Sequence, residues 1–212
     1  QIFVVEQAFA AALGTGLPVY EPQGSFVVDI GGGTTEVALV SMGGVVLSHS
    51  VRVAGNKIDE AIAGFLKKQH AILVTDRVAE QIKFDLADVR SEKKMEHIAV
   101  VRGRDIATGM PLTVDVNMAN VSEAIREPLQ EILGAIKWVL GRVPPELCSD
   151  ILQNGIYLTG GSAALPNLDT MIATEFGVPV SVARDAGECT TLGAGYMADH
   201  FDMLGGVSGK ND

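Results

Sequence analysis

The sequence predicts an α/β protein that carries a small inserted α+β subdomain. Hydrophobic residues make up 47% of the 212 residues and aromatic residues only 5%, which suits a core of Val, Ile, Leu and Ala. Short apolar runs alternate with helical patterns, and an early group of three runs forms a meander with glycines at its first bend. Between residues 70 and 121 the pattern departs from this layout and then returns to it. We therefore expect one domain from residues 1–69 and 122–204, an inserted subdomain over 70–121, and a disordered tail over 205–212.

Strands are predicted where short runs rich in Val, Ile and Leu are bounded by glycines or polar residues. The run at 25–30 is followed by three consecutive glycines, and the run at 35–41 by a Met-Gly-Gly turn. The predicted strands are 2–5, 25–30, 35–41, 45–53, 96–101, 112–116, 155–158 and 179–182. We expect the last of them to lie at a sheet edge.

Helices are predicted where apolar residues recur at helical spacing, as Ile58, Ile62 and Leu66 do. The predicted helices are 6–13, 56–69, 76–87, 120–140, 145–152, 167–176 and a last one that begins near residue 188. The longest has Asn120 or Ser122 as its N-cap, and Pro128 predicts a kink or local break within it.

Charge and cysteine content exclude several classes of protein. The net charge of −10 argues against nucleic acid as a partner, since neutralising phosphates requires a clustered Lys/Arg surface. Cys148 and Cys189 lie far apart without a CxxC spacing, so we expect a reducing cytoplasm, with neither a disulfide framework nor a zinc site. No apolar run reaches the roughly 18 residues that span a bilayer. The opening residues lack both an initiator Met and the basic leader of a signal peptide, so a fragment, a processed chain and a partial chain all stay open.

The strongest candidate site is the sequence Val-Val-Asp-Ile-Gly-Gly-Gly-Thr-Thr-Glu at residues 27–36. Here a buried strand ends in a carboxylate, and backbone N–H groups freed of Cβ atoms are able to converge on phosphate oxygens. The phosphate-binding candidates are Gly31, Gly32, Gly33, Thr34 and Thr35. Asp29 is positioned to hold a divalent metal through water. The alternative is an ordinary Gly-rich hairpin with an Asp cap.

A second glycine turn, Thr-Gly-Gly-Ser at residues 159–162, again ends a strand and precedes a helix. Its backbone is able to approach a planar base or an α-phosphate, although a plain strand-to-helix turn explains it equally well. Gly193 and Gly195 form a third pair, for which helix packing is at least as good an explanation as ligand binding. None of these turns is a Walker A loop or a GxGxxG fingerprint.

The two turns together resemble those of the actin, hexokinase and heat-shock chaperone superfamily of ATPases, and more narrowly the MreB family of rod-shape-determining bacterial actins. Further stretches typical of that family occur in its order over almost the whole chain. They lie at residues 10–18, 51–55, 59–62, 79–83, 101–105, 108–111, 144–147 and 192–195. The resemblance implies an actin-like, ribonuclease H-like ATPase domain, in which the insertion is the upper small subdomain of the family's second half.

The resemblance also implies roles for individual residues with ATP and Mg²⁺ as cofactors. Residues 29–35 would be the second phosphate loop, with Thr34 at the γ-phosphate or its attacking water and Asp29 on Mg²⁺ through water. The adenosine loop would be Gly160, Gly161, Ser162 and Ala163. Glu80 and Lys83 would approach the ribose and base, and for these two a solvated helix face is the alternative. Departures from the family pattern are Ser162 in place of a third glycine, Asn56 in place of Asp, and Gln7 in place of Pro.

In this family the first phosphate loop and the acid that orients the attacking water precede the segment that the chain resembles. The resemblance therefore implies ATP hydrolysis by a complete protein and not by these residues alone. It implies a cytoplasmic filament protein that controls cell shape, with copies of itself and possible membrane-associated shape or organelle proteins as partners, and membrane contact only through elements outside this chain. The alternatives are a magnetosome-type filament protein, a chaperone-like ATPase or sugar kinase, and a non-catalytic scaffold module.

Overall fold

A computed structural model describes residues 4–89 and 97–200, and its larger sheet has five strands in the order β3-β2-β1-β7-β8. The strands are β1 (Ser25–Ile30), β2 (Thr35–Ser41), β3 (Gly44–Val51), β7 (Ile156–Thr159) and β8 (Val180–Val182). The first three form an antiparallel meander, and β7 pairs in parallel with both β1 and β8. The predicted meander and the predicted edge position of β8 are therefore confirmed.

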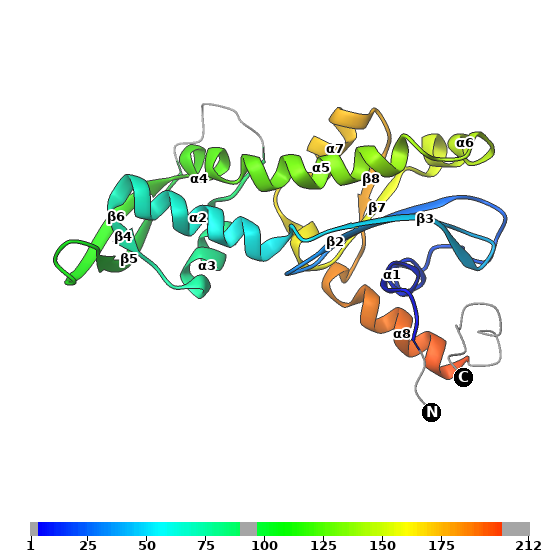
Figure 1. The fold of residues 1–212 in the computed structure, drawn as a ribbon, viewed down its shortest axis with the longest axis horizontal. Coiled ribbons are helices and arrows are strands. Elements are labelled where there is room, and N and C mark those ends of the chain that lie inside the picture. Colours follow the sequence, from blue (N-terminus) through cyan, green and yellow to red (C-terminus); the bar gives the residue numbers. More distant parts are fainter. Residues whose placement is uncertain (1–3, 90–96, 201–212) are drawn as a thin grey trace.

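Helices cover both faces of this sheet (Figure 1). On one face lie α1 (Gln7–Gly14) and α8 (Cys189–Asp199), and on the other α5 (Arg126–Leu140), α6 (Pro145–Asn154) and α7 (Leu168–Phe176). Strand β1 is buried along its whole length because its alternate side chains enter different apolar clusters. Val27 packs with the cluster around α1, whereas Val28 packs with the larger cluster beneath α5.

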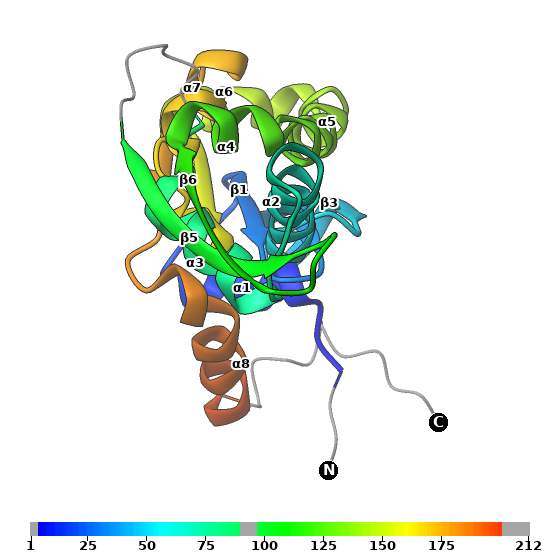
Figure 2. The same ribbon diagram turned by 90° about the vertical axis from the view of Figure 1, so that its left-hand side faces the viewer.

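A second sheet of three antiparallel strands, in the order β4-β5-β6, lies at the other end of the molecule and faces the viewer in Figure 2. Its strands are β4 (Ile72–Leu73), β5 (Ile98–Asp105) and β6 (Pro111–Asn117), with α2 (Gly55–His70), α3 (Asp76–Leu86) and α4 (Met118–Ala124) packed around them. The strands of this sheet all fall within the predicted insertion. Its core, however, is continuous with the larger one, since Ile58, Leu66 and Ile72 belong to the same apolar cluster.

The predicted helix over 120–140 is interrupted, but the break lies at Ile125, where α4 and α5 meet, and not at Pro128. Asn117, and neither Asn120 nor Ser122, caps α4, since its Oδ1 accepts hydrogen bonds from the N–H groups of Ala119 and Asn120. Pro128 lies in the first turn of α5, where a missing N–H group costs no helical hydrogen bond.

Other differences from the predicted elements are small. Residues 4 and 5 of the predicted first strand are not in a strand, and residues 2–3 lie outside the described residues, as does the predicted tail over 205–212. The two-residue strand β4 was not predicted. Short 3₁₀ turns, η1 (Gly161–Ala164) and η2 (Ala186–Glu188), follow β7 and β8. Within the described ranges, no helix has the length and apolarity that a membrane crossing requires.

Candidate functional site

The turn between β1 and β2 directly follows the end of a fully buried strand. It is closed by a hydrogen bond of 3.0 Å from the Gly31 N–H to the Thr34 carbonyl. Gly32 and Gly33 are exposed, and a Cβ added to Gly33 would meet no described atom within 4 Å. None of the three glycines has a positive φ. At Gly33 the backbone is therefore uncovered, and a ligand is able to approach it closely.

Thr34 and Thr35, which follow the glycines, have different surroundings. Thr35 is fully buried, and its hydroxyl donates to the Val53 carbonyl at 2.7 Å, which ties the turn to the segment before α2. Thr34 is half-buried at the open side of the turn. Of the two hydroxyls, only that of Thr34 is left available to a ligand.

The second glycine turn packs directly against the end of β1. Strands β1 and β7 are parallel neighbours in which Asp29 aligns with Thr159, so both end at the same sheet edge. Gly160 follows with φ +85°, and a Cβ there would overlap the Ile30 carbonyl and lie 2.5 Å from Asp29 Oδ1. Gly160 is therefore required both by its conformation and by the closeness of the two chains. Gly161 is exposed beside it, with nothing within 4 Å of an added Cβ.

The first residues of α2 are bound to the first glycine turn, a contribution that the sequence alone did not predict. The N–H of Gly55 donates to the Gly31 carbonyl at 3.1 Å, and the N–H of Asn56 donates to the Gly32 carbonyl at 2.8 Å. The helix has no side-chain N-cap, and carbonyls of the glycine turn accept its first N–H groups instead. The signal in the sequence was the Ala-Gly-Asn at residues 54–56, between the predicted strand at 45–53 and the next predicted helix.

Ser162 adds a side-chain link between the turns. Its buried hydroxyl donates to the Gly31 carbonyl at 2.9 Å. A Cβ added to Gly55 would lie 2.5 Å from Ser162 Oγ. Ser162 lies in η1 and is not among the residues with positive φ. Serine in place of a third glycine is therefore compatible with this loop. Ala163, which follows it, is buried beneath the turn.

Asp29 is 3% exposed, and its Oδ2 accepts hydrogen bonds from Gln7 Nε2 at 2.9 Å and Thr190 Oγ1 at 3.0 Å. The opposite residue on β2 is Glu36. Burial raises the pKa of Glu36, as do the negative charges of Asp29 and Glu6, while a hydrogen bond from the Ala8 N–H lowers it. The end of β1 is thus an acidic position held by residues from α1 and α8.

The described residues contain no group of three or more His, Cys, Asp or Glu side chains that could hold a metal ion by themselves. Asp29 nevertheless fits Mg²⁺ carried by a nucleotide. Mg²⁺ keeps several waters and takes one or two carboxylates together with phosphate oxygens. A single carboxylate beside an open glycine turn suits that arrangement.

Of the two predicted residues on α3, Lys83 lies next to the turns. It is 3% exposed, its Nζ is 2.9 Å from Asp59 Oδ1, and it donates to Asp59 Oδ2 at 3.1 Å. Burial raises the pKa of Asp59, and the ion pair with Lys83 opposes that effect. A Cβ added to Gly55 would lie 3.4 Å from the Lys83 nitrogen. Glu80 lies one helical turn earlier and is exposed.

The third glycine pair contributes to helix packing. A Cβ on Gly193 of α8 would overlap the Ala10 carbonyl of α1, and one on Gly14 would overlap the Cys189 carbonyl. Gly195 has open space around it. The packing explanation of this pair therefore holds for Gly193.

Comparisons with known proteins agree on one family. The family described as MreB/Mbl protein matches residues 1–206. The chain is 43% identical over 203 residues to the cell shape-determining protein Mbl of Bacillus subtilis, covering 96% of the chain and 61% of Mbl. It is 44% identical over 206 residues to the cell shape-determining protein MreB of Escherichia coli, covering 97% and 59%. The chain thus spans about 60% of the length of these relatives.

Solved structures show the same fold. MreB5 of Spiroplasma citri bound to ADP superimposes with a TM-score of 0.88 at 31% identity, covering 95% of this chain and 61% of that one. The same protein bound to AMPPNP gives a TM-score of 0.87, again at 31% identity, covering 93% of this chain and 59% of that one. A MamK double helical filament gives 0.71 at 22% identity, covering 92% and 58%, which supports the fold alone. The predicted actin-like α/β fold is confirmed.

Proposed function

The chain belongs to the MreB/Mbl family, and from this premise we propose that it forms one wall of an ATP–Mg²⁺ site in a cytoskeletal filament protein. The observation that carries the proposal is the meeting of three backbone segments at one sheet edge. These are the turn at residues 31–34, the turn at 160–163 and the first residues of α2. The N–H groups of Gly55 and Asn56 are used by carbonyls of the first turn, so the exposed backbone of Gly32 and Gly33 is the part that favours a bound anion.

In this proposal the phosphates lie on the open side of Gly31, Gly32 and Gly33. The exposed backbone there allows close approach, and the Thr34 hydroxyl contacts the γ-phosphate or its attacking water. Asp29 accepts hydrogen bonds from waters on Mg²⁺. Its position is supported by the donors Gln7 and Thr190, which hold the carboxylate at the strand end.

The adenosine would lie along Gly160, Gly161, Ser162 and Ala163, with Lys83 and Glu80 toward the ribose and base. Exposure of Gly161 and Glu80 leaves room for a ligand on that side. Lys83 is tied to Asp59 and is adjacent to Gly55, so its charge lies near the place where the two turns meet. The binding of ADP and AMPPNP by MreB5 supports the choice of an adenine nucleotide.

Hydrolysis and filament formation are proposed for a complete protein, since the chain spans about 60% of its relatives. The first phosphate loop and the acid that orients water would come from residues outside the 212. The cell shape-determining role of MreB and Mbl supports a cytoplasmic polymer of identical subunits. Light scattering and electron microscopy of the complete protein with ATP and Mg²⁺ test this step, and a lack of filaments across protein concentrations contradicts it.

Calorimetric titration of the chain with ATP and Mg²⁺ tests the binding wall itself. We expect weak saturable binding, and the Asp29→Asn variant should lower Mg²⁺ affinity in the ATP complex by about ten-fold because outer-shell ligands typically act at that scale. Asp115→Asn on the exposed face of β6 is the matched control. A chain that folds, as judged by circular dichroism, yet takes up no ATP would indicate a non-catalytic scaffold module instead.

A further inference from the structure

Strand β5 has an edge that no described segment covers. It pairs with β6 along Ile98–Arg104, but on its other side β4 reaches only Arg104 and Asp105. After Leu73 the chain turns away into α3. Among residues 4–89 and 97–200, no strand therefore pairs with β5 on that side over residues 98–102.

The backbone groups on this edge follow from the alternation of an antiparallel strand, in which neighbouring residues point their N–H and C=O groups to opposite sides. The His97 carbonyl accepts from Met118 on the β6 side, whereas the Ile106 N–H donates to Ala71 on the β4 side. Even-numbered residues therefore face away from β6. Ile98, Val100 and Arg102 present their N–H and C=O groups along the open edge.

A groove of about 340 Å³ runs between this edge and α3. Residues 99–102 of β5 form one side, and Val78 and Ile82 of α3 supply apolar surface on the other. A strand edge beside a helix is the arrangement in which an extended peptide is able to add a strand while its side chains contact the helix.

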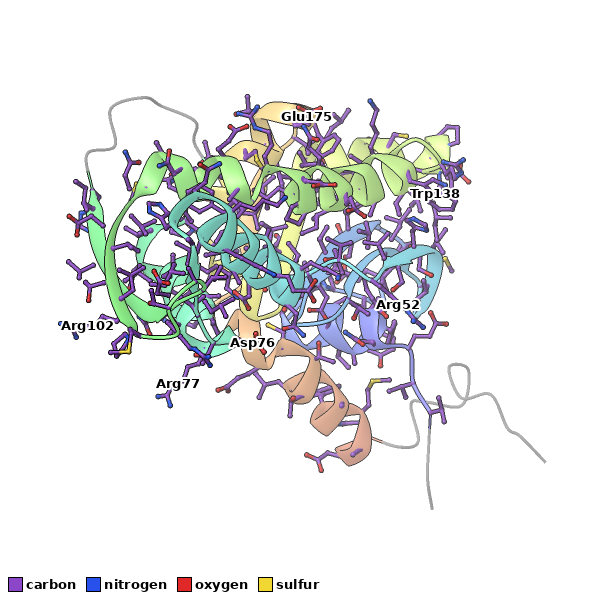
Figure 3. The ribbon with its side chains drawn as sticks, turned by 60° about the vertical axis from the view of Figure 1, so that its left-hand side comes forward. Arg52, Asp76, Arg77, Arg102, Trp138 and Glu175 are labelled. Atoms are coloured by element: carbon purple, nitrogen blue, oxygen red, sulfur yellow. The ribbon has the colours of Figure 1, made fainter. Side chains whose placement is uncertain are left out.

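Two unpaired arginines border the groove. Figure 3 shows Arg77 on α3 and Arg102 on β5 projecting from this end of the molecule, and both line the groove. Neither guanidinium forms an ion pair with a described residue. The carboxylate that lines the groove, Asp85, accepts a hydrogen bond from Gln81 Nε2 at 2.9 Å. The two free cations favour an acidic partner at this edge, although the chain as a whole has a net charge of −10.

We propose that the open edge of β5 binds an extended acidic peptide of a partner protein, which adds a fourth strand to the three-strand sheet. Main-chain hydrogen bonds to Ile98, Val100 and Arg102 supply the pairing. Acidic side chains of the peptide contact Arg77 and Arg102, and its apolar side chains rest on Val78 and Ile82.

Fluorescence polarisation with a labelled seven-residue peptide of alternating Val and Glu tests the proposal. We expect saturable binding that weakens about ten-fold in the double variant Arg77→Glu/Arg102→Glu, since two attractive charge pairs become repulsive. Arg52→Glu, at an exposed arginine that directly follows β3 (Figure 3), is the matched control and should bind as the wild type does. Equal binding by the double variant overturns the proposal.

A second arm tests strand pairing without altering the protein. The same peptide N-methylated at alternate residues keeps its charge but loses the backbone N–H donors on one edge. It should bind at least ten-fold more weakly when the methylated edge is the one that pairs with β5. NMR should show amide shifts at Ile98, Val100 and Arg102 with the unmodified peptide only. Equal binding of both peptides, or self-association of the chain through this edge in sedimentation experiments, overturns the proposal.

Discussion

The hydroxyl of Ser162 donates a hydrogen bond of 2.9 Å to the carbonyl of Gly31 and thereby fastens the two glycine turns to each other. The same carbonyl accepts the N–H of Gly55 at 3.1 Å, so three segments distant in the sequence share one oxygen atom. This oxygen thus fixes the end of β1, the start of α2 and the η1 turn relative to one another.

Replacing this hydroxyl should weaken both stability and ligand binding. We expect Ser162→Ala to lower the free energy of unfolding by about 1 kcal/mol, the net value of one buried hydrogen bond, because the Gly31 carbonyl keeps its second donor. ATP affinity should fall a few-fold because the two turns are less fixed. Urea denaturation and ATP titration measure the two effects. Ser149→Ala, on the exposed side of α6, is the control, and an unchanged unfolding curve for Ser162→Ala would contradict the prediction.

Gly160 should tolerate no side chain. Its φ of +85° is unfavourable for other residues, and an added Cβ would overlap the Ile30 carbonyl. We expect Gly160→Ala to lower the free energy of unfolding by about 3 kcal/mol, measured by urea denaturation. The neighbouring Gly161→Ala should change it by less than about 1 kcal/mol, because φ is not positive there and the space is open. Similar losses in both variants would show that the close approach of β1 and β7 is not the cause.

The sequence alone predicted the bounds of strands correctly where local signals agree with burial. Both bounds of β1 and of β2 were predicted correctly, since each is a short apolar run ended by glycine or polar residues. The break in the helix over 120–140 was predicted at Pro128 but lies at Ile125, because a proline in the first turn of a helix does not interrupt it. Strand β4 has two residues and no pattern of its own, since it exists through pairing with β5.

The site itself was only partly predictable. Each glycine turn is visible in the sequence, but their meeting depends on the parallel pairing of β1 with β7, which no local pattern specifies. The contribution of Gly55 and Asn56 depends on hydrogen bonds to Gly31 and Gly32 across a whole hairpin. Helical periodicity likewise placed Lys83 on α3 but gave no sign of its ion pair with Asp59.

The packing of α1 against α8 predicts opposite outcomes for two glycines of one helix. Gly193→Ala should lower the free energy of unfolding by about 2–3 kcal/mol, since its Cβ would overlap the Ala10 carbonyl and push the helices apart. Gly195→Ala should raise it by roughly 0.5–1 kcal/mol, because alanine favours an exposed helix and nothing obstructs it. Thermal and urea denaturation measure both. Stabilisation of the chain by Gly193→Ala would exclude a close helix contact.

The raised pKa of Glu36 predicts that the free energy of unfolding depends on pH. The direction of this dependence follows from the surroundings of Glu36. Burial, Asp29 and Glu6 raise its folded-state pKa above the ordinary 4.5, so the folded state binds this proton more tightly than the unfolded state does. The stabilising contribution is full below pH 4.5 and is lost as pH rises through the folded pKa. Glu36→Gln carries no charge and is still able to accept from the Ala8 N–H. The variant should therefore gain stability over the wild type as pH rises from 4 to 7.

Urea denaturation of the wild type and Glu36→Gln at pH 4 and pH 7 measures this difference. Glu175→Gln, an exposed position on α7 (Figure 3), is the control and should give a much smaller change between the two pH values. A difference between Glu36→Gln and the wild type that is equal at both pH values would show that packing, and not charge, decides the effect. A wild type that gains on the variant toward pH 7 would mean that the ionised carboxylate is stabilised in the fold, as a cation at Asp29 and Glu36 would cause. Repeating the titration with added Mg²⁺ separates these cases, because a bound cation lowers the pKa of Glu36 and shrinks the gain of the variant.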